Sequence, residues 1–93
     1  MRLISNKSLR DFAAWQHAAA VPLQAWRKLI ERSTFNNFDE LRRVFNSADK
    51  VGDYFVFNIA GNRYSVIAAI HFNTQTLYVR AVLTHAEYDQ WRP

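Results

Sequence analysis

The sequence predicts an α+β fold in which two N-terminal helices pack on one face of an antiparallel or mixed sheet of about four strands, followed by a short C-terminal helix. Three observations lead to this prediction. Apolar residues recur every three to four positions as far as about residue 45, and the period changes to two from Tyr54 onward. In the second half, Gly61-Asn62 separates two strand-like segments as a hairpin turn does.

Size and composition limit what the chain can be. Its 93 residues, 49% of them hydrophobic, can bury one core, so a single domain over residues 1–93 is expected. The absence of cysteine excludes disulfides, thiolate metal sites and a cysteine nucleophile. The opening "MRLISNKSLRDF" turns polar too early for a signal peptide, and no apolar run is long enough to span a membrane. We therefore expect a cytoplasmic protein with no membrane contact.

The chain carries an excess of positive charge. Twelve lysines and arginines against eight acidic residues give a formal net charge of +4, and the sequence pI is near 9.9. Such a surface attracts partners that bear phosphate, although many basic domains bind no nucleic acid. The charge therefore favours a polyanionic partner without identifying it.

The first half of the chain predicts three helical segments after a short strand-like opening, "MRLIS". Ser5 or Asn6 can cap a helix over about residues 6–17. Pro22 suits the first turn of a second amphipathic helix over about residues 22–33, and "NNFDELRRVF" predicts a short third one. The apolar stripe of the second helix comprises Leu23, Trp26, Leu29 and Ile30.

The second half begins with a hairpin whose register follows from its turn. Gly61 can supply the positive φ that a two-residue loop needs, which places Ala60 opposite Arg63. Alternation then gives the hairpin an apolar face, predicted to pack on the helices, and a polar one. The apolar face comprises Phe55, Phe57, Ile59, Tyr64, Val66 and Ala68, and the other comprises Tyr54, Val56, Asn58, Ala60, Arg63, Ser65 and Ile67.

A second turn at "NTQT" returns "LYVRAVLT" antiparallel to residues 63–72. A symmetric loop there predicts three pairs, namely Phe72 with Leu77, Ile70 with Val79 and Val66 with Leu83. Arg80 and Thr84 then join Arg63 on the polar face. A sheet face with two guanidinium groups beside amides and hydroxyls is a receptor for phosphate, because the guanidinium plane presents donors that match phosphate oxygens.

Two stretches, "FVFNIAGNRYSV" and "YVRAVLTHAEYDQW", together with the opening "MRLISNKSLRDF", make the chain similar to HigB-type toxins of the RelE superfamily. The resemblance covers nearly the whole chain and implies a RelE-like toxin domain. It also implies an endoribonuclease that cleaves mRNA on the translating ribosome and is silenced by a HigA-type antitoxin. That antitoxin carries a helix-turn-helix domain, so operator DNA would be reached only through it.

The chemistry implied by the resemblance needs no metal or other cofactor. The 2′-hydroxyl attacks the adjacent phosphate and leaves a 2′,3′-cyclic phosphate and a 5′-hydroxyl, a reaction open only to RNA. It requires a base, an acid and cations. We assign His85 as general acid or base, since imidazole changes charge near neutral pH. His71, His85, Glu87 and Asp89 lack the spacing of a metal motif, so no metal site is predicted.

The other site residues are assigned on the same basis. Arg63 and Arg80 would hold the scissile phosphate, and Tyr88, one helical turn after His85, would stack on a base or assist proton transfer. The segment "VFNSADKVGDY" also resembles the family's link into the sheet. Further contacts with the RNA backbone and bases are assigned to Lys50, Asn58 and Asn62.

One position departs from the family. Relatives commonly have arginine at the position of Ser65, in a G-N-x-x-R pattern, whereas this chain has Arg63 instead. Residues 63 and 65 share a face of the strand, so Arg63 can take the role from a displaced position. Alternatively, the catalytic cation is missing and the protein is weakly active or inactive.

Two other functions agree with the same sequence. One is a basic RNA-binding module without catalysis, and the other is a structural partner that modulates the repression exerted by a transcription factor. Toxicity that is lost with the His85 imidazole indicates catalysis, and toxicity that is retained indicates binding alone. If neither the unaltered chain nor the variant without the His85 imidazole is toxic to a bacterial host, the structural role is indicated.

Overall fold

The computed structural model describes residues 1–93 and contains one five-stranded mixed sheet of order β1-β5-β4-β3-β2. β1 runs parallel to β5, and the other neighbours are antiparallel. The predicted α+β class is thus confirmed, with β2 as an additional short strand. The strands are β1 (Arg2–Ile4), β2 (Asp49–Val51), β3 (Tyr54–Ile59), β4 (Tyr64–His71) and β5 (Thr76–Thr84), and the helices are α1 (Asn6–Trp15), α2 (Ala20–Arg32), α3 (Phe38–Val44) and α4 (His85–Gln90).

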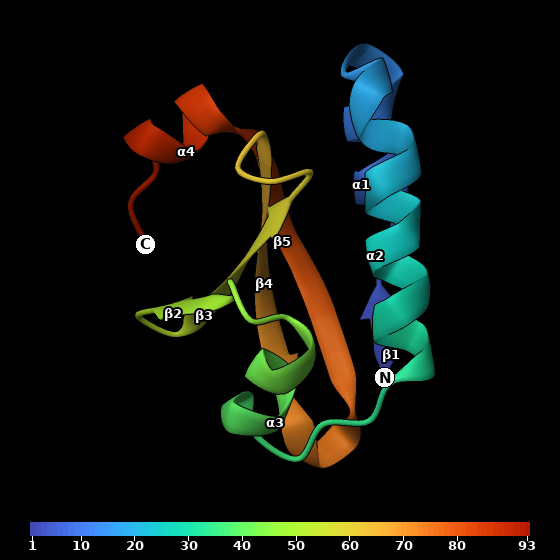
Figure 1. Ribbon diagram of the computed structural model, residues 1–93, viewed down its shortest axis with the longest axis vertical. Coiled ribbons are helices and arrows are strands. Elements are labelled where there is room, and N and C mark those ends of the chain that lie inside the picture. Colours follow the sequence, from blue (N-terminus) through green and yellow to red (C-terminus); the bar gives the residue numbers. More distant parts are fainter.

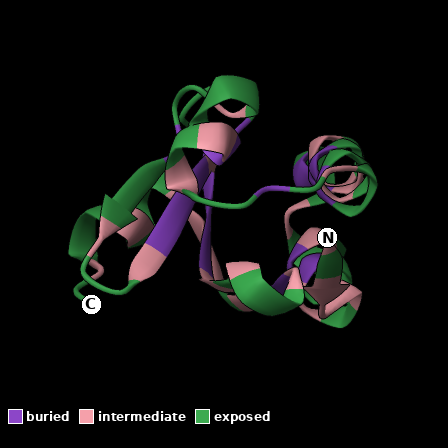
Figure 2. Cartoon of the chain, turned by 90° about the horizontal axis from the view of Figure 1, so that it is seen from below, coloured by how far each residue is buried: buried purple, intermediate pink, exposed green.

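The two N-terminal helices cover one face of the sheet, as predicted. α1 packs against α2 and β5, and α2 packs against β1 and β3 (Figure 1). Buried positions line the space between the helices and the strands, while the outer surfaces of the helices are exposed (Figure 2). Trp26 of α2 lies on Phe57 of β3, with ring centroids 5.1 Å apart. Of the predicted α2 stripe, Leu29 is the exception and is exposed.

Local sequence explains where the helices begin. α2 starts two residues earlier than predicted, after a 3₁₀ turn at His17–Ala19, and Pro22 falls in its first turn. At α3, the Asn37 side chain accepts a hydrogen bond from the Glu40 N–H at 2.9 Å. The Glu40 carboxylate in turn accepts from the Asn36 N–H at 3.0 Å. These bonds satisfy N–H groups that a helix start leaves without partners.

The β3–β4 hairpin has the predicted register. Ile59 pairs with Tyr64, and Asn58 pairs with Ser65. Gly61 has a φ of +69°, as expected of its place in the turn, but Ala60 also has a positive φ, of 54°. The paired residues end at Ile59 and Tyr64, so the loop is longer than the predicted two residues. All six residues of the predicted apolar face are buried in the core shared with the helices.

The β4–β5 register was predicted wrongly. Gln75 adopts a left-handed conformation, with a φ of 52°, and its side-chain amide donates to the Phe72 carbonyl at 2.8 Å. The pair that closes the loop is therefore one residue earlier on both strands than the predicted pair of Phe72 with Leu77. His71 pairs with Thr76, and Ile70 pairs with Leu77.

A β-bulge then shifts the register again. Ala68 pairs with Val79, whereas the residue before it in β4, Ile67, pairs with Ala81, so that Arg80 is the extra residue. Beyond the bulge Leu83 pairs with Ser65 and Thr84 with Tyr64, which reverses the faces predicted for Leu83 and Thr84. Val82 packs against the core in place of Leu83.

The other face of the sheet is more covered than the alternation predicts. Val56 and Ile67 lie on this face, yet they are buried and stand apart from the core under α1 and α2. α4 packs against β4 and β5 on the side away from those helices (Figure 1). None of the helices is both long and apolar enough to cross a membrane.

Candidate active site

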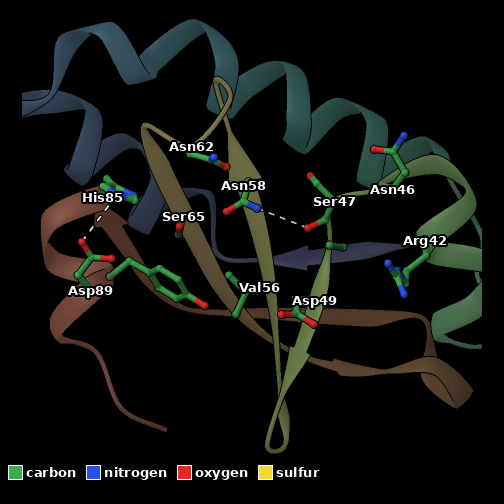
Figure 3. Close-up of a pocket in the computed structure, with 12 residues that line it drawn as sticks. Arg42, Asn46, Ser47, Asp49, Val56, Asn58, Asn62, Ser65, His85 and Asp89 are labelled. Atoms are coloured by element: carbon green, nitrogen blue, oxygen red, sulfur yellow. Dashed lines mark hydrogen bonds and ion pairs between the residues drawn. The ribbon is translucent and has the colours of Figure 1, made fainter.

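A polar cavity of about 500 Å³ opens on the sheet face away from α1 and α2. α4 forms one wall, α3 and the segment before β2 form the opposite wall, and β3 and β4 form the floor (Figure 3). The cavity therefore joins segments from the middle and the end of the chain. Its lining comprises Arg42, Asn46, Ser47, Ala48, Asp49, Val56, Asn58, Asn62, Ser65, His85, Tyr88 and Asp89.

The position of α4 is set by its first residues. The Thr84 hydroxyl accepts a hydrogen bond from the Glu87 N–H at 3.2 Å, and the Glu87 carboxylate accepts from the Thr84 N–H at 2.9 Å. This reciprocal pair is a capping box. In addition, the His85 N–H donates to the Arg63 carbonyl at 3.0 Å, which ties the start of α4 to the β3–β4 hairpin.

Loss of this cap should destabilise α4. We expect Thr84→Ala to lower the free energy of unfolding by about 0.5–2 kcal/mol, because a Glu87 N–H loses its acceptor. Thr84→Ser keeps the hydroxyl and should keep most of the stability. Urea unfolding followed by circular dichroism measures both variants. Equal losses for alanine and serine would show that the threonine methyl group matters and the cap does not.

α4 presents three polar side chains to the cavity. His85 Nε2 lies 3.6 Å from the Asp89 carboxylate, one helical turn on, so a protonated imidazole would form an ion pair there. Tyr88 lies between them in sequence and stacks on Trp91, with ring centroids 5.9 Å apart and planes inclined by 18°. The stacking orients the phenol, so this helix offers two groups that can transfer protons.

The floor and the opposite wall supply amides and hydroxyls. The Asn58 amide donates to the Ser47 carbonyl at 3.4 Å, and Asn62 reaches the cavity from the hairpin loop (Figure 3). Ser65 is almost fully buried and lines the cavity. These neutral groups can donate to phosphate oxygens or to the edge of a base.

The charges inside the cavity are mixed. Arg42 is the one arginine in the lining, and Asp49 and Asp89 are its two carboxylates. Because the positive charge inside the cavity does not exceed the negative charge, attraction for a polyanion must come largely from the surrounding surface.

The structure brings together four of the seven predicted site residues, namely His85, Tyr88, Asn58 and Asn62. The other three do not line this cavity. The Arg63 guanidinium lies over the Tyr64 ring at 5.5 Å, although its backbone holds His85. Arg80 lines a separate cavity, and the Lys50 ammonium donates to the Gly52 carbonyl at 2.8 Å.

Several lining residues were not predicted as site residues. Asp89 lies four residues after His85, a helical spacing that was available as a signal. Arg42 had no such signal, because its direction depends on how α3 docks against the sheet through Phe38 and Phe45. The same holds for Asn46, Ser47 and Asp49, which follow α3 into β2.

The fold and this cavity define a small basic α+β protein with an imidazole, a phenol and amides on one sheet face, the arrangement expected of a RelE-like toxin. Comparison with known proteins agrees. The family HigB_toxin, described as the RelE-like toxic component of a toxin-antitoxin system, matches residues 19–91. The chain belongs to this family of HigB toxins, and membership implies an antitoxin as partner.

Individual relatives match over almost the whole chain. The mRNA interferase toxin HigB of Escherichia coli (strain K12) is 36% identical over 92 residues, which is 96% of this chain and 88% of the relative. The mRNA interferase HigB of Shigella flexneri matches to the same extent. An mRNA interferase HigB of Escherichia coli O6:H1 is 28% identical over 93 residues, covering 97% of this chain and 90% of the relative.

Proposed function

We propose that the protein is the toxin of a toxin-antitoxin pair and acts as an endoribonuclease that cleaves mRNA without a metal ion. The observation that carries this proposal is the presence of His85 and Tyr88 in one cavity with amide and hydroxyl donors and an arginine. The names of the relatives, which are mRNA interferases, support the same activity.

The reaction proposed is attack of the RNA 2′-hydroxyl on the adjacent phosphorus. A new bond forms between the 2′-oxygen and phosphorus, and the bond from phosphorus to the 5′-oxygen breaks. One proton leaves the 2′-hydroxyl and one is added to the 5′-oxygen, so the products are a 2′,3′-cyclic phosphate and a 5′-hydroxyl. We assign these two transfers to His85 and Tyr88, one as base and the other as acid.

Asp89 would orient the imidazole and stabilise it when it is charged, since its carboxylate lies 3.6 Å from Nε2. Arg42 and the amides of Asn58 and Asn62 would stabilise the charge that develops on the phosphate oxygens. Arg63 and Arg80 would add positive charge from outside the cavity, and Lys50 would contact the RNA backbone on the exposed β2 edge.

We further propose that cleavage takes place on the translating ribosome in the cytoplasm. Because the cavity contains one imidazole and charges of both signs, part of the binding of the RNA must come from groups outside it. Basic side chains outside the cavity, on α2 (Arg27, Lys28 and Arg32) and on α3 (Arg43), would contact ribosomal RNA together with Arg42 at the cavity edge, with Arg27 also paired with Glu31. The antitoxin would be a HigA-type helix-turn-helix protein, through which alone operator DNA would be contacted.

The end chemistry of cleaved mRNA tests the proposed function. Purified mRNA is incubated with the protein, with and without ribosomes, and the new ends are mapped and tested for cyclic phosphate and 5′-hydroxyl. Cyclic phosphate ends that form only with ribosomes present are expected. Ends with a 5′-phosphate would exclude the proposed reaction, and an absence of cleavage in both samples would leave binding without catalysis.

Two arginines on different helices separate a local role from a general effect of charge. We expect Arg42→Ala to lower the cleavage rate about 10- to 150-fold, the effect of a charge-assisted hydrogen bond worth about 1.5–3 kcal/mol. Arg10→Ala removes the same charge from an exposed position on α1, away from the cavity and from the basic side chains proposed to contact ribosomal RNA, and should change the rate only slightly. Rates are measured on the same mRNA. Equal losses for both variants would exclude a specific role for Arg42.

A further inference from the structure

A second cavity, of about 330 Å³, lies beside the first between the outer face of the sheet and the C-terminal segment. Its floor includes Ile67 of β4 and Arg80 of β5, and Tyr54 of β3 contributes a side. Trp91 and Arg92 enclose it from the chain that follows α4. The central strands and the C-terminal region of the chain therefore contribute to both cavities.

The two cavities follow one another along the strands. Ser65 of the first cavity and Ile67 of the second are two residues apart on β4, roughly 7 Å along a strand. Tyr88 lines the first cavity and stacks on Trp91, which lines the second. Trp91 also meets Tyr54 edge to face, with ring centroids 5.9 Å apart. A row of three aromatic rings thus leads from one cavity to the other.

The second cavity differs from the first in its charge. Arg80 and Arg92 line it, and no acidic side chain does. Neither arginine belongs to an ion pair of the protein, and the bulge in β5 removes Arg80 from the ladder of paired residues. The Arg80 guanidinium lies 5.3 Å from the Tyr78 ring, and that of Arg92 donates to the Trp91 carbonyl at 2.8 Å. Two guanidinium groups are therefore present without an aspartate or glutamate partner, beside Pro93 in the same lining.

Aromatic rings beside guanidinium groups are the combination that binds single-stranded nucleic acid. Bases pack on aromatic rings whatever their sequence, and arginine binds the neighbouring phosphate through its planar set of donors. A cavity that continues the active site along the same strands is placed to receive the nucleotide next to the one that reacts.

We propose that Tyr54, Arg80, Trp91 and Arg92 form a second nucleotide subsite, which binds the RNA strand beside the bond that is cleaved. Tyr54 and Trp91 contact a base, and the two arginines bind the adjacent phosphate. The proposal rests on the proposed ribonuclease function, because it takes single-stranded RNA as the ligand. It assigns the C-terminal segment after α4 to substrate binding rather than to the packing of the fold.

Binding of an RNA that cannot be cleaved tests this subsite independently of catalysis. The probe is a single-stranded 2′-O-methyl RNA of about ten nucleotides, a length within the range of known single-stranded sites. Its dissociation constant is measured for the full chain by fluorescence anisotropy at several salt concentrations. The variants are Trp91→Ala, Trp91→Phe and the pair Arg80→Gln with Arg92→Gln. The control is Arg10→Gln, an exposed arginine of α1 that lines neither of these cavities.

We expect Trp91→Ala to weaken binding about 5- to 150-fold, the range found for loss of one base stack, and Trp91→Phe to restore most of it. The double arginine variant should weaken binding and lower the slope of log Kd against log salt by about 0.7 for each phosphate that is no longer bound. Arg10→Gln should leave affinity within about twofold. Since the arginine variants leave the Tyr88–Trp91 stack intact, they also test the subsite if Trp91→Ala unfolds α4.

Unchanged affinity and salt slope in the double arginine variant would overturn the subsite, and so would failure of the unaltered chain to bind the probe. Both results leave the proposed function standing if the unaltered chain still produces cyclic phosphate ends from mRNA. Conversely, a chain that binds the probe through these residues but cleaves no mRNA would retain the subsite and lose the ribonuclease activity.

Discussion

Replacement of His85 by glutamine is expected to lower mRNA cleavage by about 10²- to 10⁴-fold, the usual contribution of a general acid or base. His85 is the one imidazole that lines the cavity, and imidazole is the side chain most often used for general acid–base catalysis. Glutamine is uncharged and has a size close to that of histidine, and the Thr84 cap of α4 does not involve the imidazole. The substitution therefore removes proton transfer while leaving the helix in place.

A second histidine provides the control. His71 is exposed at the far end of β4, where its ring meets Tyr78 with centroids 5.4 Å apart, and it does not line the cavity. His71→Gln should leave cleavage unchanged within about twofold. Both rates are measured with the same ribosomes and mRNA, and growth arrest on expression in a bacterial host is scored in parallel. Full activity in His85→Gln would remove the imidazole from the proposed reaction, and toxicity retained without cleavage would point to binding alone.

Replacement of Phe57 by alanine is expected to lower the free energy of unfolding by about 3–5 kcal/mol. The Phe57 side chain is 1% exposed and lies in the middle of the core. It contacts Trp26 of α2 at 5.1 Å and Phe45, at the end of α3, at 5.4 Å between ring centroids. One ring therefore joins both helices to the sheet, and its removal leaves a cavity that rigid strands cannot close.

An exposed apolar residue provides the matched control for Phe57. Val21 of α2 is 79% exposed, so Val21→Ala should change stability by no more than about 0.5 kcal/mol. Urea unfolding, followed by tryptophan fluorescence and by circular dichroism, measures both variants. Small domains are stable by only about 5–15 kcal/mol, so the unfolded fraction of Phe57→Ala should also be much larger than that of the unaltered protein. A loss below about 1 kcal/mol would mean that the sheet and helices repack around the missing ring.

Turn chemistry decided which parts of the sheet could be predicted from the sequence. The β3–β4 register was predicted from Gly61 and is correct, although Ala60 beside it also has a positive φ, of 54°, which its residue type does not favour. The β4–β5 register did not follow, because Gln75 takes a left-handed conformation that its residue type does not favour. The bulge at Arg80 likewise has no glycine or proline to mark it.

The residues of the candidate site likewise include some that the sequence predicts and some that it does not. Alternation along two paired strands placed Asn58 beside Ser65, and a helical spacing placed Tyr88 on the same side as His85. For Arg42 the sequence indicates only a solvated helical surface, because the packing of α3 against the sheet is what turns this residue toward the cavity. A periodic pattern shows which residues of one helix or strand share a face, but it does not show how that element packs on another. Residues that reach the site only through such packing cannot be predicted from it.

The bulge in β5 also limits how this chain can change in length. Each residue of a regular strand points to the side opposite its neighbour, and the one supernumerary residue, Arg80, interrupts this alternation in β5. Deletion of Arg80 would remove the bulge and let Ala81 follow Val79 directly, still paired with Ile67, so Val82 would keep its place against the core. An added residue beyond Ala81 that stays in the ladder would instead turn the end of β5, and the imidazole that follows it, to the opposite surface. This stretch should therefore tolerate the loss of one residue better than the gain of one.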